Sequence, residues 1–344
     1  MRLAVPTLLL FLGCLAAGAA EHTAPPEPKT LPAAAADPMQ RMPLLPKPQT
    51  SPASDLGTLE ELAPGVHIAR GKWVVLDGVL VIDKGPTDGL EVLVCLKDGK
   101  NHETLVRLDT TQGQLVKAAT IAALGLPDGL PADEGSGIPA RGQPVSLTLR
   151  WQDAGGKAVM IPASCLVRDR VVDRPFPELA WPYVGSRFEK VITNGVDGRP
   201  QAREVFMLDS TRSIVANFDE PNALIASAFP VAVNDQRFET YSAVCPPAGT
   251  VVQVVIGLAV PPLRLSLADD GTLHDAHGAL LSDEALGVTL RAVYAATPAP
   301  ALHTVVVDVA TSTARQLDVV ARARILAAAA AEKLWVTPLF VPKA

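Results

Sequence analysis

The placement of proline constrains this chain more than any other feature. Nine of its 31 prolines lie between residues 21 and 53. Two further pairs, Pro246-Pro247 and Pro261-Pro262, enclose a short segment rich in valine. A segment with so many prolines cannot bury enough apolar surface to fold, and it tends toward extended polyproline II. We therefore expect a disordered Pro/Ala-rich tether over 21–53, followed by two folded domains at 55–258 and 260–342.

The chain begins with an apolar segment. Residues 1–20 contain one charge, on Arg2, followed by an apolar stretch that ends in small residues, a pattern typical of a bacterial export signal. Ala17-Gly18-Ala19 offers a cleavage site, whereas Leu12-Gly13-Cys14 resembles a lipobox that would make Cys14 a lipid-modified N-terminus. The segment is also near the minimum length for crossing a bilayer, so the third outcome is that it stays uncleaved as a membrane span. We expect an exported chain, periplasmic or on the outer face of a membrane, that meets the membrane only through its N-terminus.

The mean hydropathy of +0.24 raises the question of a second membrane span. The uncharged stretch from Thr240 to Leu263 is the candidate, but its prolines leave only Ala248–Val260, which is too short to cross. The valines in this segment are typical of a buried strand. We expect no second span.

Charge and aromatic content bear on the partner. The formal net charge is −6, and aromatic residues make up 4% of the chain. Proteins that bind nucleic acids usually contact the phosphates through a basic surface and stack the bases on aromatic side chains. We therefore expect no nucleic-acid partner.

Short β-type segments fill the first domain. Asp77-Gly78, between Trp73–Leu76 and Val79–Ile82, predicts a two-residue hairpin of type I′. Leu115–Leu124 is the clear helix, and Gly125–Pro144 predicts a long loop of the kind that is often functional or mobile. Further strands, with turns at Asp153–Gly156 and Asn194–Gly198, are expected at Leu90–Leu96, Val145–Trp151, Ala158–Ile161, Val191–Thr193, Glu204–Leu208, Tyr241–Val244 and Val251–Ile256. This pattern predicts an α+β domain that is strand-rich and mostly antiparallel.

The second domain alternates strands and helices. Ser282 is suited to cap a helix whose apolar stripe is Leu286, Leu290 and Val293. A second helix is expected over Thr313–Lys333, and strands at Leu263–Ala268, Thr272-Leu273, His303–Val309 and Leu334–Val341. The order ββαβαβ predicts a small two-layer sandwich.

The first domain resembles the YdjY-like family of exported bacterial proteins. The resemblance rests on Val79–Gly85, Leu90–Cys95, Lys100–Val106, Trp181–Phe188, Val215–Phe218 and Pro246–Thr250, taken in order. Thr104 stands where that family usually has serine. The resemblance implies a domain type and no particular reaction.

The second domain resembles the periplasmic domain of the ExbD/TolR family of biopolymer-transport proteins. The matching segments are Pro262–Leu273, Ser282–Ala295, Thr304–Asp308 and Gln316–Val341. Val307–Ala310 replaces the family's R-A-D ending, and the N-terminal apolar segment lacks the family's proton-carrying carboxylate. The resemblance therefore implies a binding fold, dimerisation, and contact with peptidoglycan or a peptide strand, rather than a proton-coupled motor.

Cys95, Lys100, His102 and Glu103 are the candidates for chemistry. A catalytic interpretation pairs Cys95 as nucleophile with His102 as base, while Lys100 favours the thiolate. A structural interpretation has His102 and Glu103 fixing a turn through hydrogen bonds. A third interpretation is a small-ligand pocket, to which the residues of the next block along the chain, Trp181 and Ser186, would contribute.

We expect no metal and no cofactor. His102 and Glu103 would point to opposite faces of a strand, and His274-Asp275-Ala276-His277 lacks a further clustered ligand. The spacings of Cys95, Cys165 and Cys245 fit neither a zinc ribbon nor a C-x-x-C motif. An oxidising compartment allows one disulfide among these three cysteines, and the sequence does not indicate which two would form it.

Two functions from different classes remain. The first is a non-catalytic cell-envelope binding protein that contacts peptidoglycan or an envelope protein and forms a homodimer through residues 260–342. The second is an exported enzyme or metal-dependent protein that uses Cys95, Lys100 and His102.

Overall fold

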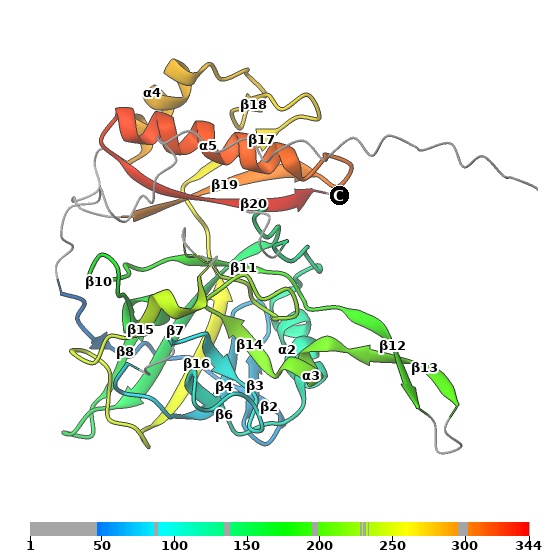
Figure 1. Cartoon of the computed structure of the whole chain (residues 1–344). Coiled ribbons are helices and arrows are strands. Elements are labelled where there is room, and N and C mark those ends of the chain that lie inside the picture. The colour runs from blue at the N-terminus through cyan, green and yellow to red at the C-terminus, as the bar shows by residue number, and fades with distance from the viewer. Residues whose placement is uncertain are drawn as a thin grey trace, which may run out of the picture.

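The computed structural model describes residues 47–85, 89–133, 138–194, 199–227, 229, 232, 234–294 and 302–343. It shows a mixed α+β chain dominated by strands (Figure 1). The expected export segment, Cys14 and most of the expected tether lie outside the described residues.

The first region contains most of the strands. In chain order its elements are β1 (Ser51–Pro52), β2 (Glu60–Ala63), β3 (Val66–Ala69), β4 (Trp73–Leu80), β5 (Val92–Cys95), β6 (Thr104–Leu108), α2 (Gly113–Leu124), β7 (Gln143–Gln152), β8 (Ala158–Pro162), β9 (Val167–Asp169), β10 (Arg174–Pro175), β11 (Ala180–Tyr183), β12 (Phe188–Asn194), β13 (Pro200–Phe206), α3 (Met207–Thr211), β14 (Ser213–Ala216), β15 (Phe238–Thr240) and β16 (Val251–Leu258). Short 3₁₀ turns occupy Ala163–Leu166 and Asp235–Arg237.

The main sheet of this region closes on itself. Its strand order is β1-β8-β7-β16-β4-β6-β5-β14, and β11 pairs with the first residues of β7, 143–146, ahead of the part that pairs with β8. Ile225 bridges Tyr183 of β11 to Val215 of β14, which joins the two ends of the ring. The pairing is antiparallel except between β5 and β6. Trp181, Tyr183 and a large set of aliphatic side chains form the buried core.

The second region has the element order ββαβαβ that the hydrophobic pattern predicts. Its elements are β17 (Leu263–Leu267), β18 (Leu273-His274), α4 (Asp283–Tyr294), β19 (Leu302–Ala310), α5 (Gln316–Ala331) and β20 (Trp335–Lys343). The sheet order is β18-β17-β19-β20, with β17, β19 and β20 parallel. Figure 1 shows α4 and α5 above this sheet and the first region below it. The buried apolar side chains here form their own cluster.

The expected hairpin at Asp77-Gly78 is wrong. Both residues lie inside β4, which runs unbroken from Trp73 to Leu80. The glycine serves a close backbone approach, because a Cβ at Gly78 would lie 2.6 Å from the carbonyl oxygen of Arg107 on β6. Glycine suits both a tight turn and a close approach of two strand backbones, and Gly78 serves the second.

Two further boundaries differ from the sequence prediction. The strand expected at Tyr241–Val244 is a turn, and β15 ends at Thr240. At the end of the expected tether, Ser51 and Pro52 pair with β8, and the amide of Ala53 donates to Ala158 at 3.0 Å. Disorder was therefore the wrong expectation for residues 51–53, because an open edge of β8 is available to pair with them.

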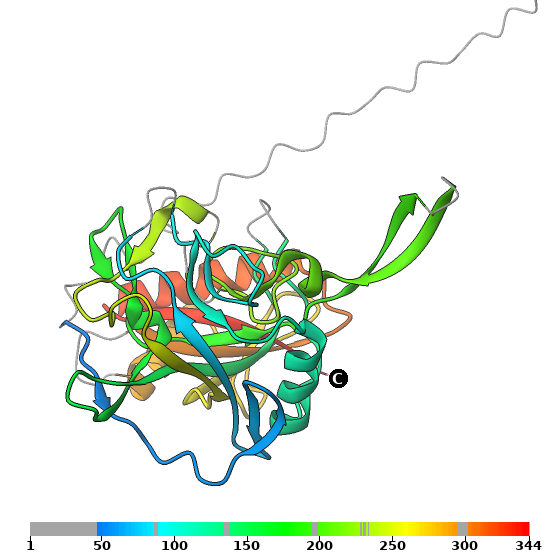
Figure 2. The same cartoon turned by 90° about the horizontal axis from the view of Figure 1, so that it is seen from below.

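One pair of strands leaves the body of the protein. β12 and β13 form a separate two-stranded sheet, and both views show it projecting away from the rest of the chain (Figures 1 and 2). We call residues 188–194 and 200–206 the arm. Its tip, residues 195–198, lies outside the described residues.

Candidate functional site

The predicted cluster around Lys100 is a pinned turn. The Nζ atom of Lys100 lies 2.6 Å from Glu91 Oε2 and 3.5 Å from Glu103 Oε2, and His102 Nε2 lies 2.8 Å from Glu103 Oε1. The hydroxyl of Thr104 donates to the carbonyl oxygen of Lys100 at 2.7 Å. His102 and Glu103 are in a turn rather than a strand, so the expectation that they point to opposite faces is wrong.

Charge inside this turn is compensated. Burial raises the pKa of the Glu103 carboxyl, but the hydrogen bond with Glu91 and the charges of Lys100 and His102 outweigh burial and hold that pKa below its usual value. Burial likewise lowers the pKa of Lys100, and the two carboxylates raise it above its ordinary value. A cation held by two carboxylates stabilises the turn and is poorly suited to activating a neighbouring thiol.

Cys95 lies beneath this turn, where it is 1% exposed. Its Sγ atom faces the side-chain carbonyl of Asn101 at 3.8 Å, while the ring of His102 is three-quarters exposed and bonded to Glu103. Burial raises the pKa of the Cys95 thiol against the smaller effects of Thr104 and Arg107. A Cβ at Gly99 would lie 2.9 Å from the sulfur, so the turn covers it closely. These contacts favour a buried structural thiol.

Trp181 and Ser186 belong to the framework. Trp181 is fully buried in β11 and makes an edge contact with Phe229 at 5.1 Å between ring centres. Ser186 adopts a positive φ of 55°, and its hydroxyl donates to the carbonyl oxygen of Asn222 at 2.7 Å. In the part of the chain that it describes, the structure does not bring these two residues together with the turn around Lys100.

Cys165 and Cys245 are free thiols, as is Cys95. Burial, with the charge of Glu178 adding to it, raises the pKa of Cys165 to about 12. Burial together with Asp83 raises the pKa of Cys245 to about 12. All three thiols are thus held in the unreactive protonated form.

His274 ends β18, and Asp275, Ala276 and His277 lie in the turn that follows it. His274 Nε2 lies 2.9 Å from the hydroxyl of Thr272, and the carboxylate of Asp275 accepts from the amides of His277 and Ala279 at 2.8 Å. Among the described residues, the structure holds no group of three or more histidine, cysteine or acidic side chains placed to bind a metal ion.

A polar row that the sequence did not predict crosses four adjacent strands. His67 of β3 lies 2.9 Å from Asp77 of β4, whose carboxylate also accepts from Gln253 of β16 at 3.0 Å. Arg150 of β7 donates to the same glutamine at 2.7 Å. The row lies beside an open hollow of about 620 Å³. The sequence pattern assigns Asp77 to a turn and therefore does not indicate this polar row.

The long loop after α2 joins the two regions. We call its described residues 129–133 and 138–142 the clasp. Arg141 donates through Nε and Nη2 to both carboxylate oxygens of Asp318 on α5, at 2.8 and 2.9 Å, and both side chains are fully buried. Gly142 N donates to Phe340 O of β20 at 2.7 Å. The clasp therefore contributes a bidentate ion pair and a backbone bond to the second region.

A second arginine completes the junction. Arg315 Nη2 donates to the carbonyl oxygens of Pro131 and Pro139, at 2.7 and 2.6 Å. Burial raises the pKa of Asp318, and the hydrogen bonds from Arg141 oppose that rise. The described part of this loop is therefore bonded to the second region through the side chains of Arg141 and Arg315.

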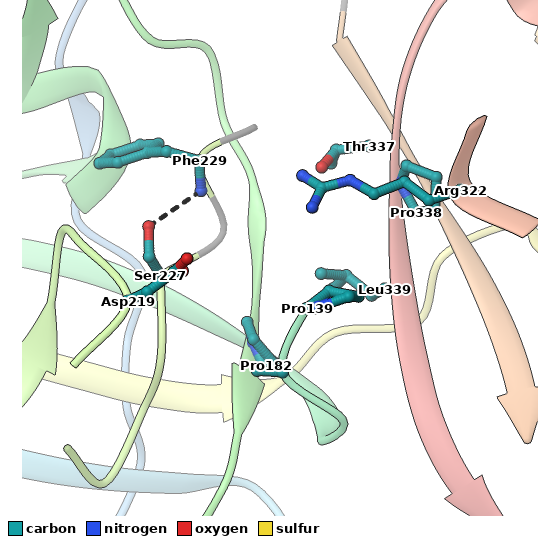
Figure 3. Close-up of a pocket in the computed structure, with 10 residues that line it drawn as sticks. Pro139, Pro182, Asp219, Ser227, Phe229, Arg322, Thr337, Pro338 and Leu339 are labelled. Atoms are coloured by element: carbon teal, nitrogen blue, oxygen red, sulfur yellow. Dashed lines mark hydrogen bonds between the residues drawn. The ribbon is translucent and has the colours of Figure 1, made fainter. Parts of the chain in front are cut away.

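A small cavity lies beside the clasp (Figure 3). Figure 3 shows the guanidinium of Arg322 extending from α5 into the space opposite Asp219, Ser227 and Phe229. Ser227 Oγ accepts from the amide of Phe229 at 3.1 Å. Burial lowers the pKa of Arg322, opposed by the charge of Asp219. The cavity volume of about 30 Å³ suits a water molecule, not a substrate.

The arm carries apolar side chains into solvent. Ile192 is 74% exposed, Phe188 52% and Val191 36%. At the base of the arm Phe188 packs against Phe206 at 4.9 Å between ring centres, and Lys117 lies over the Phe206 ring. Exposed apolar side chains gathered on a free pair of strands are typical of an interaction surface.

Comparison with family models, with curated proteins and with solved structures finds no match to this chain. Within the described residues, none of the helices is both long enough and apolar enough to cross a bilayer.

Proposed function

We propose that this chain is a non-catalytic interaction protein of the bacterial cell envelope. The observation that carries the proposal is the arm, where Phe188, Val191 and Ile192 are exposed on β12, which among the described residues pairs with β13 alone. The export pattern of residues 1–20 supplies the envelope location.

The junction between the two regions supports a binding role. The edge of β20 is partly taken by the clasp, since Arg141 and Gly142 bond alongside Phe340. Neither outer edge of the arm pairs with another strand in the part of the chain that the structure describes. We therefore place protein contact on the arm and keep contact with peptidoglycan for the second region, in line with its resemblance to ExbD/TolR periplasmic domains.

The contacts of the candidate catalytic residues favour this proposal over the enzyme alternative. Cys95 is covered by the turn at Gly99, and Lys100 is held by Glu91 and Glu103. A catalytic thiol needs access and a stabilised thiolate. The environment of Cys95 offers burial and a raised pKa instead.

Photo-cross-linking in cells that export the chain tests the proposal. A photoreactive amino acid at position 192 is expected to form protein adducts, either with a second copy or with an envelope protein. The matched control is position 280, because Leu280 is a similarly exposed apolar residue away from the arm, at 64%. Purified sacculi provide a second partner in a cosedimentation assay. Absence of adducts at 192 and of cosedimentation would overturn the proposal.

A further inference from the structure

The arm has two faces of different character. Directly opposed residues of an antiparallel pair share a face, as do residues two apart along a strand. One face therefore carries Lys190 opposite Glu204 and Ile192 opposite Ala202. At its base Phe188 lies opposite Phe206, which is 2% exposed beneath Lys117 of α2, so the free part of this face begins at Lys190 and Glu204. The other face carries Arg203 opposite Val191 and Glu189 opposite Val205.

The first face is self-complementary. A 180° rotation about an axis that is parallel to the arm and lies between the two packed faces places β12 of one copy over β13 of the other. Lys190 of each copy then lies over Glu204 of the other, and Ile192 lies over Ala202. Opposite charges meet at the centre, and a large apolar side chain meets a small one beside them. Closed two-fold contacts of this kind use the same patch on both subunits.

The same rotation does not match the other face. It would lay Arg203 over Val191 and Glu189, which is paired with Arg187 at 2.6 Å, over Val205, so each charge would meet an apolar side chain. Burying Arg203 without a counter-charge opposite it is costly. The charge pattern thus distinguishes the two faces and selects the face with Lys190 and Glu204.

We propose that the arm binds the arm of a second copy of this chain, through the face formed by Lys190, Ile192, Ala202 and Glu204, beyond the base that Lys117 covers. The inference rests on the proposed interaction function and names its partner. An isolated two-stranded hairpin is marginal in water, and packing two such sheets face to face gives each one the apolar layer that it lacks.

Charge exchange within the arm tests the pairing without disturbing either hairpin. In the double variant K190E/E204K the opposed charges of each hairpin are retained and merely swapped. We expect the wild type to dimerise with itself and the double variant to dimerise with itself. A mixed dimer would bring two lysines together at one of these contacts and two glutamates together at the other. Mixed dimers should therefore be at least about tenfold scarcer than random mixing gives.

The measurement is native mass spectrometry of ¹⁵N-labelled wild-type full chain mixed with the unlabelled double variant. Ile192→Asp should weaken the wild-type dimer, whereas Leu280→Asp, at an exposed position off the arm, should not. A monomeric wild type, free mixing of the two forms, or a dimer that tolerates Ile192→Asp would overturn the inference. If adducts at position 192 then prove to be another envelope protein, the proposed function stands and only the partner is wrong.

Discussion

The burial of the clasp and the exposure of the arm are the opposite of what their sequences predict. The clasp belongs to a Gly/Pro-rich loop, yet its Arg141 forms a fully buried ion pair with Asp318 of α5. The arm is built from two regular strands, yet its residues are nearly all exposed. Regular secondary structure therefore does not decide burial here. Burial follows from which segment has a neighbour to bond with.

The difference shows where the polar groups of each segment find their hydrogen-bond partners. Arg141 is stabilised by Asp318 and by the carbonyl oxygen of Thr313 at 3.0 Å, both from the second region. The two strands of the arm pair only with each other in the chain as described. The clasp forms its bonds within one chain, whereas we propose that the arm forms its contacts with a partner.

Removal of the buried carboxylate should produce the largest effect. Asp318→Ala leaves the Arg141 guanidinium buried without its counter-charge, so we expect a loss of about 3–5 kcal/mol in the free energy of unfolding. Denaturant unfolding measures it. Asp308→Ala is the matched control, because its pair with Arg264 is partly exposed and should cost less than about 1 kcal/mol. Equal effects of the two substitutions would show that the clasp is not a special contact.

The three thiols, two buried and Cys245 partly buried, extend the comparison to reactivity. With a pKa of about 12, Cys165 and Cys245 are only about 10⁻⁴ thiolate at pH 8, so each should react with iodoacetamide roughly a thousandfold more slowly than a free thiol. Cys95 should also be slow in the native chain, because its pKa is raised.

The pH dependence has a defined sign. Because the pKa values are raised, the rate should keep increasing as pH rises from 8 to 10 instead of levelling off. The urea-unfolded chain is the control and should react fast at all three thiols. Rapid alkylation of native Cys95 at pH 8 would instead revive the catalytic interpretation.

A methyl group inside the clasp should have a smaller effect. A Cβ at Gly142 would overlap the backbone of Tyr183, so Gly142→Ala should destabilise the chain by about 1–3 kcal/mol in thermal or denaturant unfolding. Gly155→Ala, in the exposed turn between β7 and β8, is the control and should stay within about 0.5 kcal/mol. A tolerated Gly142→Ala would mean that the clasp packs more loosely than described.

The arm should show the smallest change in stability. Ile192→Asp places a charge at a position that is already solvated, so the unfolding free energy of the dilute chain should change by less than about 0.5 kcal/mol. A loss of several kcal/mol would show that Ile192 is part of the core of its own chain and would break the contrast with the clasp.

Local chemistry could be predicted from the sequence, and long-range bonding could not. Gly125 ends α2 in the left-handed conformation, and the amide of Ala285 donates to the Ser282 hydroxyl at 3.1 Å, as the capping patterns indicate. Asp153–Gly156 is the expected turn between β7 and β8. These features depend on residues a few positions apart.

The partner of Arg141 lies 177 positions away, and no pattern within the loop indicates it. The contacts of Asp77 with Gln253 depend equally on sheet pairing between distant segments. The surroundings of the candidate residues could not be predicted for the same reason. These residues are close in sequence, but what surrounds Cys95 and Lys100 is decided by the fold of the turn, by Gly99 and by Glu91.

Hydrogen–deuterium exchange over a range of protein concentrations tests the central claim most directly. The amides of Leu130, Arg141 and Gly142 are bonded within the chain, so the clasp should exchange slowly at every concentration. Peptides from residues 188–194 and 200–206 should exchange rapidly when dilute and more slowly as the concentration rises and the arms pair. Protection of the arm that is independent of concentration, or a clasp that exchanges as rapidly as the arm, would contradict the account.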